Sequence, residues 1–357
     1  MINNILEGWQ KKQLSEFKYI KGKSNPEYCY GDFVYLTPEY LRDGLEPVFV
    51  DIFPKAILTN EIDSILLWDG SNAGEVFRSK KGILASTMVK FEINQNIISP
   101  NYFYYYLKLQ QEKIKSETRG SGIPHVDKST LSKINIIYPI NLKEQNKIIE
   151  ILQCVDNILA ETKEFIKKFK NIKQGLMQDF FEGRNNKKVP LGSIVTFEYG
   201  TGLLDRDRTG DGYPVYGSNG IIGYHKEFIV DQKGIIIGRK GTAGSVNFSS
   251  KPFWPIDTTY YVKLKKKNNF KFFYYYLDFI DLKKLEASTG VPGLNRNDAY
   301  NLLIYDIPTA EQEIISAILS NLDYLIDIEK NYFIKIKNIK SGLMFDLLTG
   351  KVRVKID

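Results

Sequence analysis

Two stretches of about forty residues carry the most regular hydrophobic pattern in the chain. Apolar residues recur at alternating steps of four and three across residues 142–182 and again across 309–349, and they fill eight of ten positions each time. A 3.5-residue repeat sustained over several heptads is typical of a long helix packed along another helix. We therefore predict two helices, each about 60 Å long at 1.5 Å per residue, that pack on each other in antiparallel orientation.

The alternative for either stretch is a single amphipathic helix lying on a globular core. Two equally long and equally patterned stretches favour the pair. Polar residues interrupt both registers at matching places, Thr162 with Glu329 and Lys173 with Lys340. The residues predicted to pack between the helices are Leu152, Val155, Leu159, Ile166, Phe169 and Leu176 in the first stretch, and Leu319, Leu322, Ile326, Phe333, Ile336 and Leu343 in the second.

Glycines mark both the ends and the interiors of these two predicted helices. Gly183 and Gly350 follow the last apolar residue of each pattern and are predicted to be C-terminal caps. Gly175 and Gly342 stand inside the pattern, where a glycine costs ~1 kcal/mol relative to alanine. We expect these two either to let the helices approach closely or to mark a bend.

The segment before each predicted long helix has a different pattern. Short apolar runs alternate with Gly, Asn and Asp turns, as in residues 64–70 and 234–246, which predicts short β-strands. Residues 101–117 and 269–286 are each predicted to form one helix. Each segment is therefore a mixed α/β domain followed by one long helix.

The two halves of the chain are copies of one unit. The string KNIKQGLMQDFFEGR begins at Lys170, and KNIKSGLMFDLLTGK begins 167 residues later, at Lys337. Upstream, Gly122-Ile123-Pro124 matches Gly290-Val291-Pro292. A unit of about 170 residues is too long for a solenoid repeat and indicates duplication of a whole domain with its helix. The predicted parts are two α/β domains, residues 1–140 and 189–308, and two helical segments, residues 141–188 and 309–357.

Composition narrows the classes of function. The chain has 357 residues and a net charge of +7, which permits a nucleic-acid partner without requiring one. Two cysteines, Cys29 and Cys154, cannot form a disulfide framework or a zinc ribbon, which favours a reducing, cytoplasmic location. Two histidines, His125 and His225, leave little scope for a histidine-based metal or catalytic centre. No run approaches the ~18 apolar residues of a membrane span, and residues 1–13 lack a signal-peptide core.

Local strings that resemble catalytic motifs are incomplete. Gly200-Thr201-Gly202 lacks the flanking strand and helix of a nucleotide loop, and Asn25-Pro26-Glu27-Tyr28 has Glu where amino-methyltransferases have Pro. In the run from Gly238 to Ser245 the lysine precedes the glycine, unlike a phosphate-binding P-loop. Asp231-Gln232-Lys233 has no second acidic residue at the spacing of a nuclease site. No catalytic residue and no metal site is therefore predicted.

Two glycine-rich loops remain that are suited to reading nucleic acid, although a charged run can also be a solvated surface. Arg239 and Lys240 stand among glycines between predicted strands, where they can reach phosphates or a guanine edge. Matching Ala73-Gly74 to Ala243-Gly244 places Arg239-Lys240 on Asp69-Gly70. We therefore expect one scaffold with different chemistry in each copy. The predicted DNA-contacting residues are Trp68, Ser71, Asn72, Arg78, Lys80 and Lys81 in the first copy, and Tyr216, Ser218, Asn219, Arg239, Lys240 and Thr242 in the second.

The helical segments share motifs at both ends. They begin with Glu144-Gln145 and Glu311-Gln312, and they end in Leu-Met-x-Asp-x-x-x-Gly followed by Arg184 or Lys351. With the Gly-Ile/Val-Pro turns and the second-copy stretches PVYGSNGIIGYH and GRKGTAGSV, these motifs resemble the specificity subunit of type I restriction–modification systems. The resemblance covers nearly the whole chain.

That resemblance implies two target recognition domains joined by two long antiparallel coiled-coil helices, with an internal pseudo-twofold duplication. Each domain would read one half of a split, asymmetric double-stranded DNA site in the major groove, and the helices would set the gap. It implies that the chain itself is not an enzyme and binds no cofactor. It also implies two methyltransferase (modification) subunits that use S-adenosylmethionine, and restriction/translocase subunits that use ATP and magnesium, with no membrane partner.

Two other classes of function remain open at this point. One is a single-chain nuclease or methyltransferase with a duplicated binding region, which would cleave or methylate DNA without partners. The other is a coiled-coil assembly adaptor without a DNA role. Such an adaptor would lack the steep salt dependence that phosphate contacts give to DNA binding.

Overall fold

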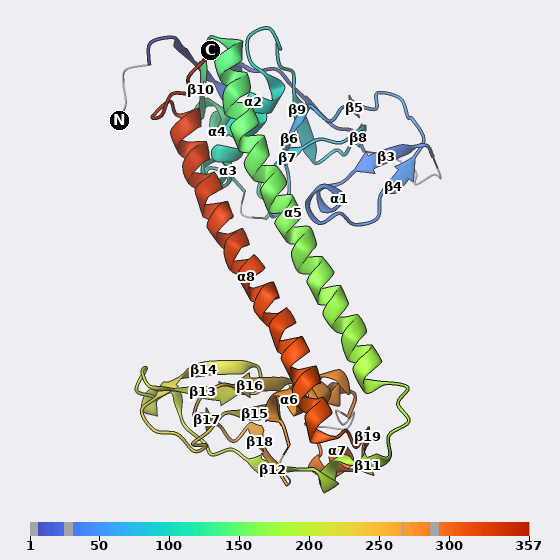
Figure 1. The fold of residues 1–357 in the computed structure, drawn as a ribbon. Coiled ribbons are helices and arrows are strands. Elements are labelled where there is room, and N and C mark those ends of the chain that lie inside the picture. Colours follow the sequence, from blue (N-terminus) through green and yellow to red (C-terminus); the bar gives the residue numbers. More distant parts are fainter. Residues whose placement is uncertain (1–5, 25–30, 121, 266–267, 286–292, 357) are drawn as a thin grey trace. The chain divides into compact units, whose positions relative to one another are not determined.

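The computed structural model describes residues 6–24, 31–120, 122–265, 268–285 and 293–356. The chain divides into two compact units: unit 1 consists of residues 1–161 and 332–357, and unit 2 of residues 162–331. Each unit contains one α/β domain and part of each of two helices of 40 residues, α5 (Leu142–Phe181) and α8 (Thr309–Leu348) (Figure 1). The Gly290-Val291-Pro292 turn, the segment Asn25-Pro26-Glu27-Tyr28 and Cys29 lie outside the described residues.

Unit 1 is built on two sheets of four strands each within the described residues. One is antiparallel, in the order β2-β9-β6-β7 (Tyr19–Lys21, Met88–Phe91, Ser64–Leu67, Val76–Arg78). The other has the order β4-β3-β8-β5 (Val48–Val50, Phe33–Leu36, Gly82–Leu84, Leu58–Thr59), and its β3 and β8 are parallel. The other elements are the antiparallel pair β1 (Trp9–Gln13) and β10 (Asn135–Pro139), helices α1 (Pro38–Asp43), α2 (Pro100–Leu109), α3 (Gln111–Ser116) and α4 (Lys128–Ser132), and the short 3-10 helix Leu14–Glu16.

Unit 2 repeats this plan with one sheet reduced. Its antiparallel sheet has the order β12-β18-β15-β16 (Val195–Tyr199, Thr259–Leu264, Gly234–Gly238, Val246–Ser249). The second sheet, β14-β13-β17 (Gly220–His225, Tyr213–Gly217, Trp254–Pro255), keeps the parallel contact, between β13 and β17. The other elements are the pair β11 (Lys188–Pro190) and β19 (Leu303–Tyr305), helices α6 (Phe270–Phe279) and α7 (Arg296–Tyr300), and the 3-10 helices Leu191–Ser193, Asp205–Asp207 and Leu282–Leu285.

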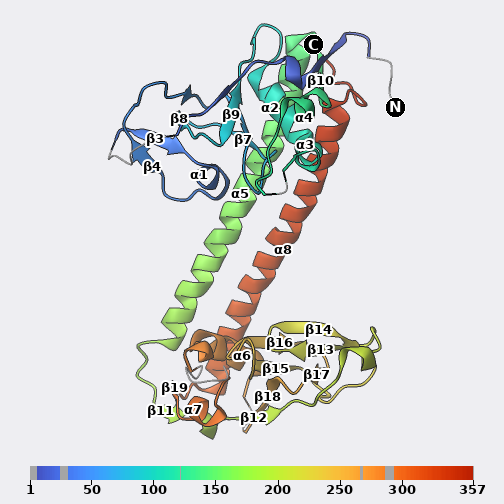
Figure 2. The ribbon, with the colours of Figure 1, turned by 180° about the vertical axis from the view of Figure 1, so that it is seen from behind.

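An aromatic helix closes the domain in each unit. The Phe-Tyr-Tyr-Tyr-Leu string lies in α2 and again in α6, where Tyr105 and Tyr275 are fully buried. In unit 1, α2, α3 and α4 lie beside the C-terminal part of α8 (Figure 2), and the Tyr102 hydroxyl donates to the Leu348 carbonyl at 3.4 Å. The aromatic string therefore forms the core that joins each domain to the long helices.

The prediction of one continuous helix in each of these segments is wrong. In unit 1, α2 ends at Leu109 and α3 begins at Gln111, whose side chain accepts the Val76 backbone N–H at 3.0 Å. In unit 2, α6 ends at Phe279, and Asp281 adopts a positive φ of 52°, which an L-residue helix does not tolerate. In unit 1 a side-chain contact to β7 accompanies the break in the helix, and in unit 2 a residue in the left-handed region follows its end.

The two long helices pack together in antiparallel orientation, as predicted. In unit 1, Asp156 of α5 pairs with Lys340 of α8 and accepts the Tyr105 hydroxyl at 2.6 Å. In unit 2, the matching residue Asp323 of α8 pairs with Lys173 of α5 at 2.6 Å. The Tyr275 hydroxyl donates to Asp323 at 2.7 Å. The lysines that interrupt the hydrophobic register therefore link the helix pair to the aromatic helix of each domain.

The Glu-Gln pairs at the helix starts have partners of similar kind in both units, although the second donor bond of Gln312 goes to the Asn268 side chain at 3.0 Å and not to a backbone carbonyl. Gln145 is fully buried, donates to the Ile97 and Pro139 carbonyls at 2.9 and 2.8 Å, and accepts the Ser99 N–H at 2.8 Å. Gln312 likewise donates to the Ile307 carbonyl at 2.8 Å and accepts the Asn269 N–H at 3.0 Å. Their neighbours are in ion pairs as well, Glu144 with Arg353 and Glu311 with Arg184. These contacts fix each long helix to its own domain.

The capping prediction for the glycines is confirmed, and of the two roles expected for the glycines inside the helices, close approach is excluded and a bend stays a prediction. Gly183 and Gly350 have positive φ angles of 62° and 72°, which confirms their role as left-handed caps. At Gly175 and Gly342, an added Cβ would meet no heavy atom within 4 Å, so these glycines do not serve a close approach of helices. Of the twelve predicted packing residues, Leu152, Leu319 and Ile326 are buried and the others are half-buried.

Candidate nucleic-acid interface

The ends of the central strands define matching positions in the two units. In unit 1, the backbone N–H groups of Trp68 and Asp69 both donate to the Thr87 carbonyl, at 2.8 and 3.2 Å. The Trp68 carbonyl accepts the Val126 N–H at 2.8 Å, and the backbones of Asp69 and His125 form an isolated antiparallel β-bridge. This places the loop after β6 beside the segment that leads into α4.

Unit 2 repeats this pattern bond for bond. The N–H groups of Arg239 and Lys240 both donate to the Thr258 carbonyl, at 2.9 and 3.1 Å. The Arg239 carbonyl accepts the Leu294 N–H at 2.9 Å, and the backbones of Lys240 and Gly293 form an isolated antiparallel β-bridge. By these bonds Arg239 occupies the position of unit 1's Trp68.

The match of Arg239 to Asp69 that the sequence suggested is therefore wrong by one residue. The Leu67 N–H donates to the Glu75 carbonyl in unit 1, while the Gly238 N–H donates to the Ser245 carbonyl in unit 2. The turn enclosed by these bonds is one residue longer in unit 1, because 67 to 75 spans one step more than 238 to 245. An alignment of the two copies on Ala73-Gly74 and Ala243-Gly244, at the end of this turn, is therefore shifted by one residue at the start of the turn.

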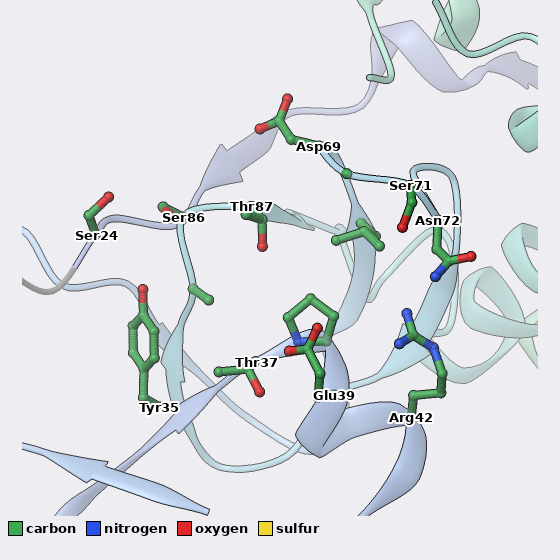
Figure 3. A pocket seen from close by; sticks show the side chains of 14 residues that line it. Ser24, Tyr35, Thr37, Glu39, Arg42, Asp69, Ser71, Asn72, Ser86 and Thr87 are labelled. Atoms are coloured by element: carbon green, nitrogen blue, oxygen red, sulfur yellow. The ribbon is translucent and has the colours of Figure 1, made fainter. Parts of the chain in front are cut away.

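In unit 1 the loop after β6 borders a pocket of ≈ 500 Å³ (Figure 3). Ser71 and Asn72 line it from this loop, and Asn72 lies close to Arg42 of α1 (Figure 3). Arg42 is held by Glu75, with its Nε 3.0 Å from Oε2. The opening is lined by hydroxyl, amide and carboxylate side chains, which are groups that can donate to or accept from base edges.

The remaining side chains predicted in unit 1 have different surroundings. Trp68 stacks on Tyr19 with ring centroids 4.9 Å apart. Arg78 donates to Asn101 Oδ1 at 2.6 Å and lies over the Tyr104 ring at 4.5 Å, so it takes part in the packing of α2. Lys80 lies over the Tyr40 ring at 4.1 Å, and Lys81 is exposed.

The residues predicted in unit 2 likewise fall into two groups, those with partners inside the protein and those exposed to solvent. Tyr216 is buried, and this burial raises the pKa of its hydroxyl. The Ser218 hydroxyl donates to the Thr258 carbonyl at 3.0 Å, so it holds the loop rather than projecting from it. Asn219, Lys240 and Thr242 are exposed. The structure thus places these three, with half-buried Arg239, at one end of the unit 2 domain.

Sequence reasoning missed the side chains that other segments bring to these loops. In unit 2 the guanidinium groups of Arg239 and Arg296 lie over the same ring, that of Tyr199, at 5.3 and 5.2 Å. In unit 1, Lys21 pairs with Asp69 at 2.6 Å. No local motif identifies Tyr199, Arg296 or Lys21, because each is close to the loop only in the folded chain.

Comparisons with known proteins agree with this arrangement. The family described as "Type I restriction modification DNA specificity domain" matches residues 6–170 and 183–338. The type I restriction enzyme MjaVIII specificity subunit of Methanocaldococcus jannaschii is 32% identical over 98% of this chain and 94% of its own. The EcoprrI specificity subunit of Escherichia coli is 26% identical over 68% of this chain and 64% of its own.

Solved structures show the same fold. The S subunit of a type I restriction–modification system from M. genitalium superimposes with a TM-score of 0.71 at 20% identity, covering 99% of this chain and 98% of that one. A chain from a structure of type I restriction–modification complex assembly gives a TM-score of 0.61 at 14% identity, covering 98% of this chain and 100% of that one.

The chain has the duplicated DNA-reading architecture of a specificity subunit. It belongs to the specificity subunits of type I restriction–modification systems. Its role is recognition of a bipartite DNA sequence through two target recognition domains within a restriction–modification complex. Among the described residues, no helix is both long and apolar enough to cross a membrane.

Proposed function

We propose that the chain has no catalytic activity of its own and that each unit reads one half of the bipartite site. The observation that carries this proposal is the repeated frame with different side chains, Trp68 and Asp69 in unit 1 against Arg239 and Lys240 in unit 2. DNA phosphates are alike in every sequence, whereas base edges differ, so divergence on one frame fits two readers of different bases.

The proposed contacts in unit 1 are the pocket residues Ser71 and Asn72 with Trp68 of the same loop. Lys80 and Lys81 are proposed contacts as well, although the antiparallel pairing of β6 with β7 places them beside the start of β6, at the end opposite to that loop. In unit 2 they are Asn219, Arg239, Lys240 and Thr242. Arg78, Tyr216 and Ser218 would support these loops from within, since their polar groups have partners inside the protein.

We propose two modification subunits as direct partners, with restriction/translocase subunits joining through them. Support comes from the part of α8 in unit 2, where apolar side chains outside the predicted helix contact are exposed. Ile314 is 61% exposed, Leu325 40% and Ile328 43%. A regularly spaced apolar stripe on a helix is suited to packing against helices of a partner. S-adenosylmethionine, ATP and magnesium would then be bound by the partners, in the cytoplasm.

The test is reconstitution. The purified chain, alone and with the modification subunits, is incubated with DNA and S-adenosylmethionine, and methylated adenines are mapped by sequencing. The proposal expects methylation only with the partners, at a two-part motif with a fixed gap. Methylation or cleavage by the chain alone would instead establish a single-chain enzyme. Binding to the modification subunits without sequence-selective DNA binding would establish an assembly adaptor.

A further inference from the structure

One end of unit 2 gathers two arginines around one tyrosine. Tyr199 is the last residue of β12 and is 52% exposed. Arg239 directly follows β15 and lies 5.3 Å from the Tyr199 ring, and Arg296 begins α7 and lies 5.2 Å from it. Three segments far apart in sequence therefore converge on a partly exposed cationic cluster.

These two arginines have no carboxylate partner among the described residues, unlike most arginines of the chain. Every arginine except Arg78, Arg239 and Arg296 lies within 4.0 Å of a carboxylate in the described part of the chain. Arg78 donates instead to Asn101. Two neighbouring guanidinium groups without a counter-ion repel each other, so the cluster is best satisfied by an electron-rich partner from outside.

The hydrogen bonds of Arg239 leave one edge of its guanidinium group available. Its Nε and Nη2 atoms both donate to the Asp257 carbonyl, at 3.0 and 2.6 Å. A guanidinium group has five N–H donors, so both N–H groups of Nη1 and one of Nη2 stay unused at its far end. That pair of nitrogens matches the O6 and N7 acceptors of guanine. Because the carbonyl and the Tyr199 ring hold the side chain, little conformational entropy is lost when it binds.

The matching positions of unit 1 separate base contacts from phosphate contacts. Arg239 matches Trp68, a neutral side chain. Arg296 matches Lys128, because each is the first residue of the short helix that follows the cap residue Asp127 or Asn295. A contact to phosphate suits a cation in both units, since the DNA backbone is the same in both half-sites. A contact to a base does not require the same side chain twice.

We propose that Arg239 reads a guanine in the half-site bound by unit 2, and that Arg296 contacts a phosphate beside it. This inference rests on the proposed DNA-reading role of the two units. Tyr199 is a positioning residue that holds both guanidinium groups. Unit 1 has no arginine at the matching position, so it reads its half-site with other groups.

The experiment selects binding sites from a random double-stranded DNA library, with the full chain in complex with its modification subunits. The wild type is compared with Arg239→Lys, Arg239→Ala and Arg296→Ala. Lysine keeps the charge of residue 239 but has no fork, so both substitutions at 239 should weaken the preference for one guanine by about tenfold to a hundredfold. The other half-site should be unchanged.

Arg296→Ala should weaken binding evenly across sequences and lower the salt dependence by about one released counterion. The matched control is Lys188→Ala, which removes the same charge from unit 2. Lys188 lies over the Tyr305 ring at 4.8 Å, on β11, and not in the cluster. Thermal unfolding of each variant checks that the domain remains folded.

Three results would overturn the inference. The first is a wild-type motif that both 239 variants retain with unchanged guanine preference. The second is full rescue by Arg239→Lys of what Arg239→Ala loses, which would show that the positive charge alone, and not the paired N–H groups of arginine, makes the contact. The third is a library without any two-part motif for the wild type, which would remove the proposed function as well. The first two leave the proposed function intact.

Discussion

Unit 1 and unit 2 hold the long helices with the same contacts but present different side chains at the ends of the same strands. Asp156, Lys340 and Tyr105 in unit 1 recur as Asp323, Lys173 and Tyr275 in unit 2. At the loop after the central strand, however, the same backbone bonds carry Trp68 in one unit and Arg239 in the other. The duplicated copies have kept the contacts with the helices and changed the exposed edge.

The contacts that hold the long helices are made by buried polar groups in both units. Burial is the first cause of the raised pKa values of the Tyr105 and Tyr275 hydroxyls, followed in Tyr105 by the hydrogen bond to its Asp partner. These tyrosines therefore remain protonated donors at neutral pH. Buried polar groups need fixed partners, so this network tolerates little change, whereas exposed loops tolerate much.

The largest effect is expected from lengthening the helix that both units share. Four residues inserted into α5 after Ala160 would add about 6 Å and rotate the following residues by about 40°. If the helices set the gap, DNA with the native gap should lose nearly all binding, and a different gap should be preferred. Selection from a library of variable gaps measures this. A four-residue insertion after Asp211, in an exposed turn of unit 2, is the control; an unchanged gap in the α5 variant would contradict the proposal.

A smaller effect should follow from the buried glutamines. Gln145→Ala leaves the Ser99 N–H and two carbonyls without their partners, which should lower the free energy of unfolding by about 3 kcal/mol. Gln312→Ala should cost a similar amount, measured by chemical denaturation. Gln178→Ala, on an exposed part of α5, should change stability by less than about 0.5 kcal/mol. A large difference between Gln145→Ala and Gln312→Ala would break the view that both units use one frame.

Glycines inside and after the helices should respond in opposite directions. Gly175→Ala and Gly342→Ala should each stabilise the protein by up to ~1 kcal/mol, because the new methyl groups meet no atom and the helix propensity improves. Gly183→Ala should destabilise it by about 1 kcal/mol, because this residue has a positive φ. Thermal unfolding compares the three. Destabilisation by both helical substitutions would indicate a required bend at these positions.

The smallest predicted difference is in pH dependence and separates the short helices α4 and α7. The Asp127 side chain caps α4 and accepts the Thr130 N–H at 2.7 Å. This hydrogen bond is the largest cause that lowers the pKa of Asp127 to about 2. A carboxyl group whose pKa is lower in the folded than in the unfolded state stabilises the fold at any pH above its unfolded pKa. This stabilisation is lost as the pH falls from about 4 towards 2. The α7 cap is Asn295, which does not titrate. The hydrogen-exchange protection factors of α4, relative to the intrinsic exchange rate at each pH, should therefore fall on acidification more than those of α7, and Asp127→Asn should remove that excess.

Much of the fold follows from patterns that are local in sequence. The 3.5-residue repeat predicts both long helices, and the glycines at 183 and 350 predict where they end. Alternating runs and turns predict strands such as β6 and β15. Predictions became wrong where a distant contact intervened, as at Gln111, whose bond to β7 divides the expected helix.

The sequence alone determined that this protein is a duplicated domain with two paired helices and no recognisable catalytic motif, because periodicity and repetition can be read along the chain. Only the tertiary structure decided that Arg239 matches Trp68. It also brought Tyr199 and Arg296 to Arg239, across gaps of 40 and 57 residues. Side chains that bind together depend on which strand ends meet, and strand pairing is set by long-range hydrogen bonds and burial, to which no local pattern corresponds.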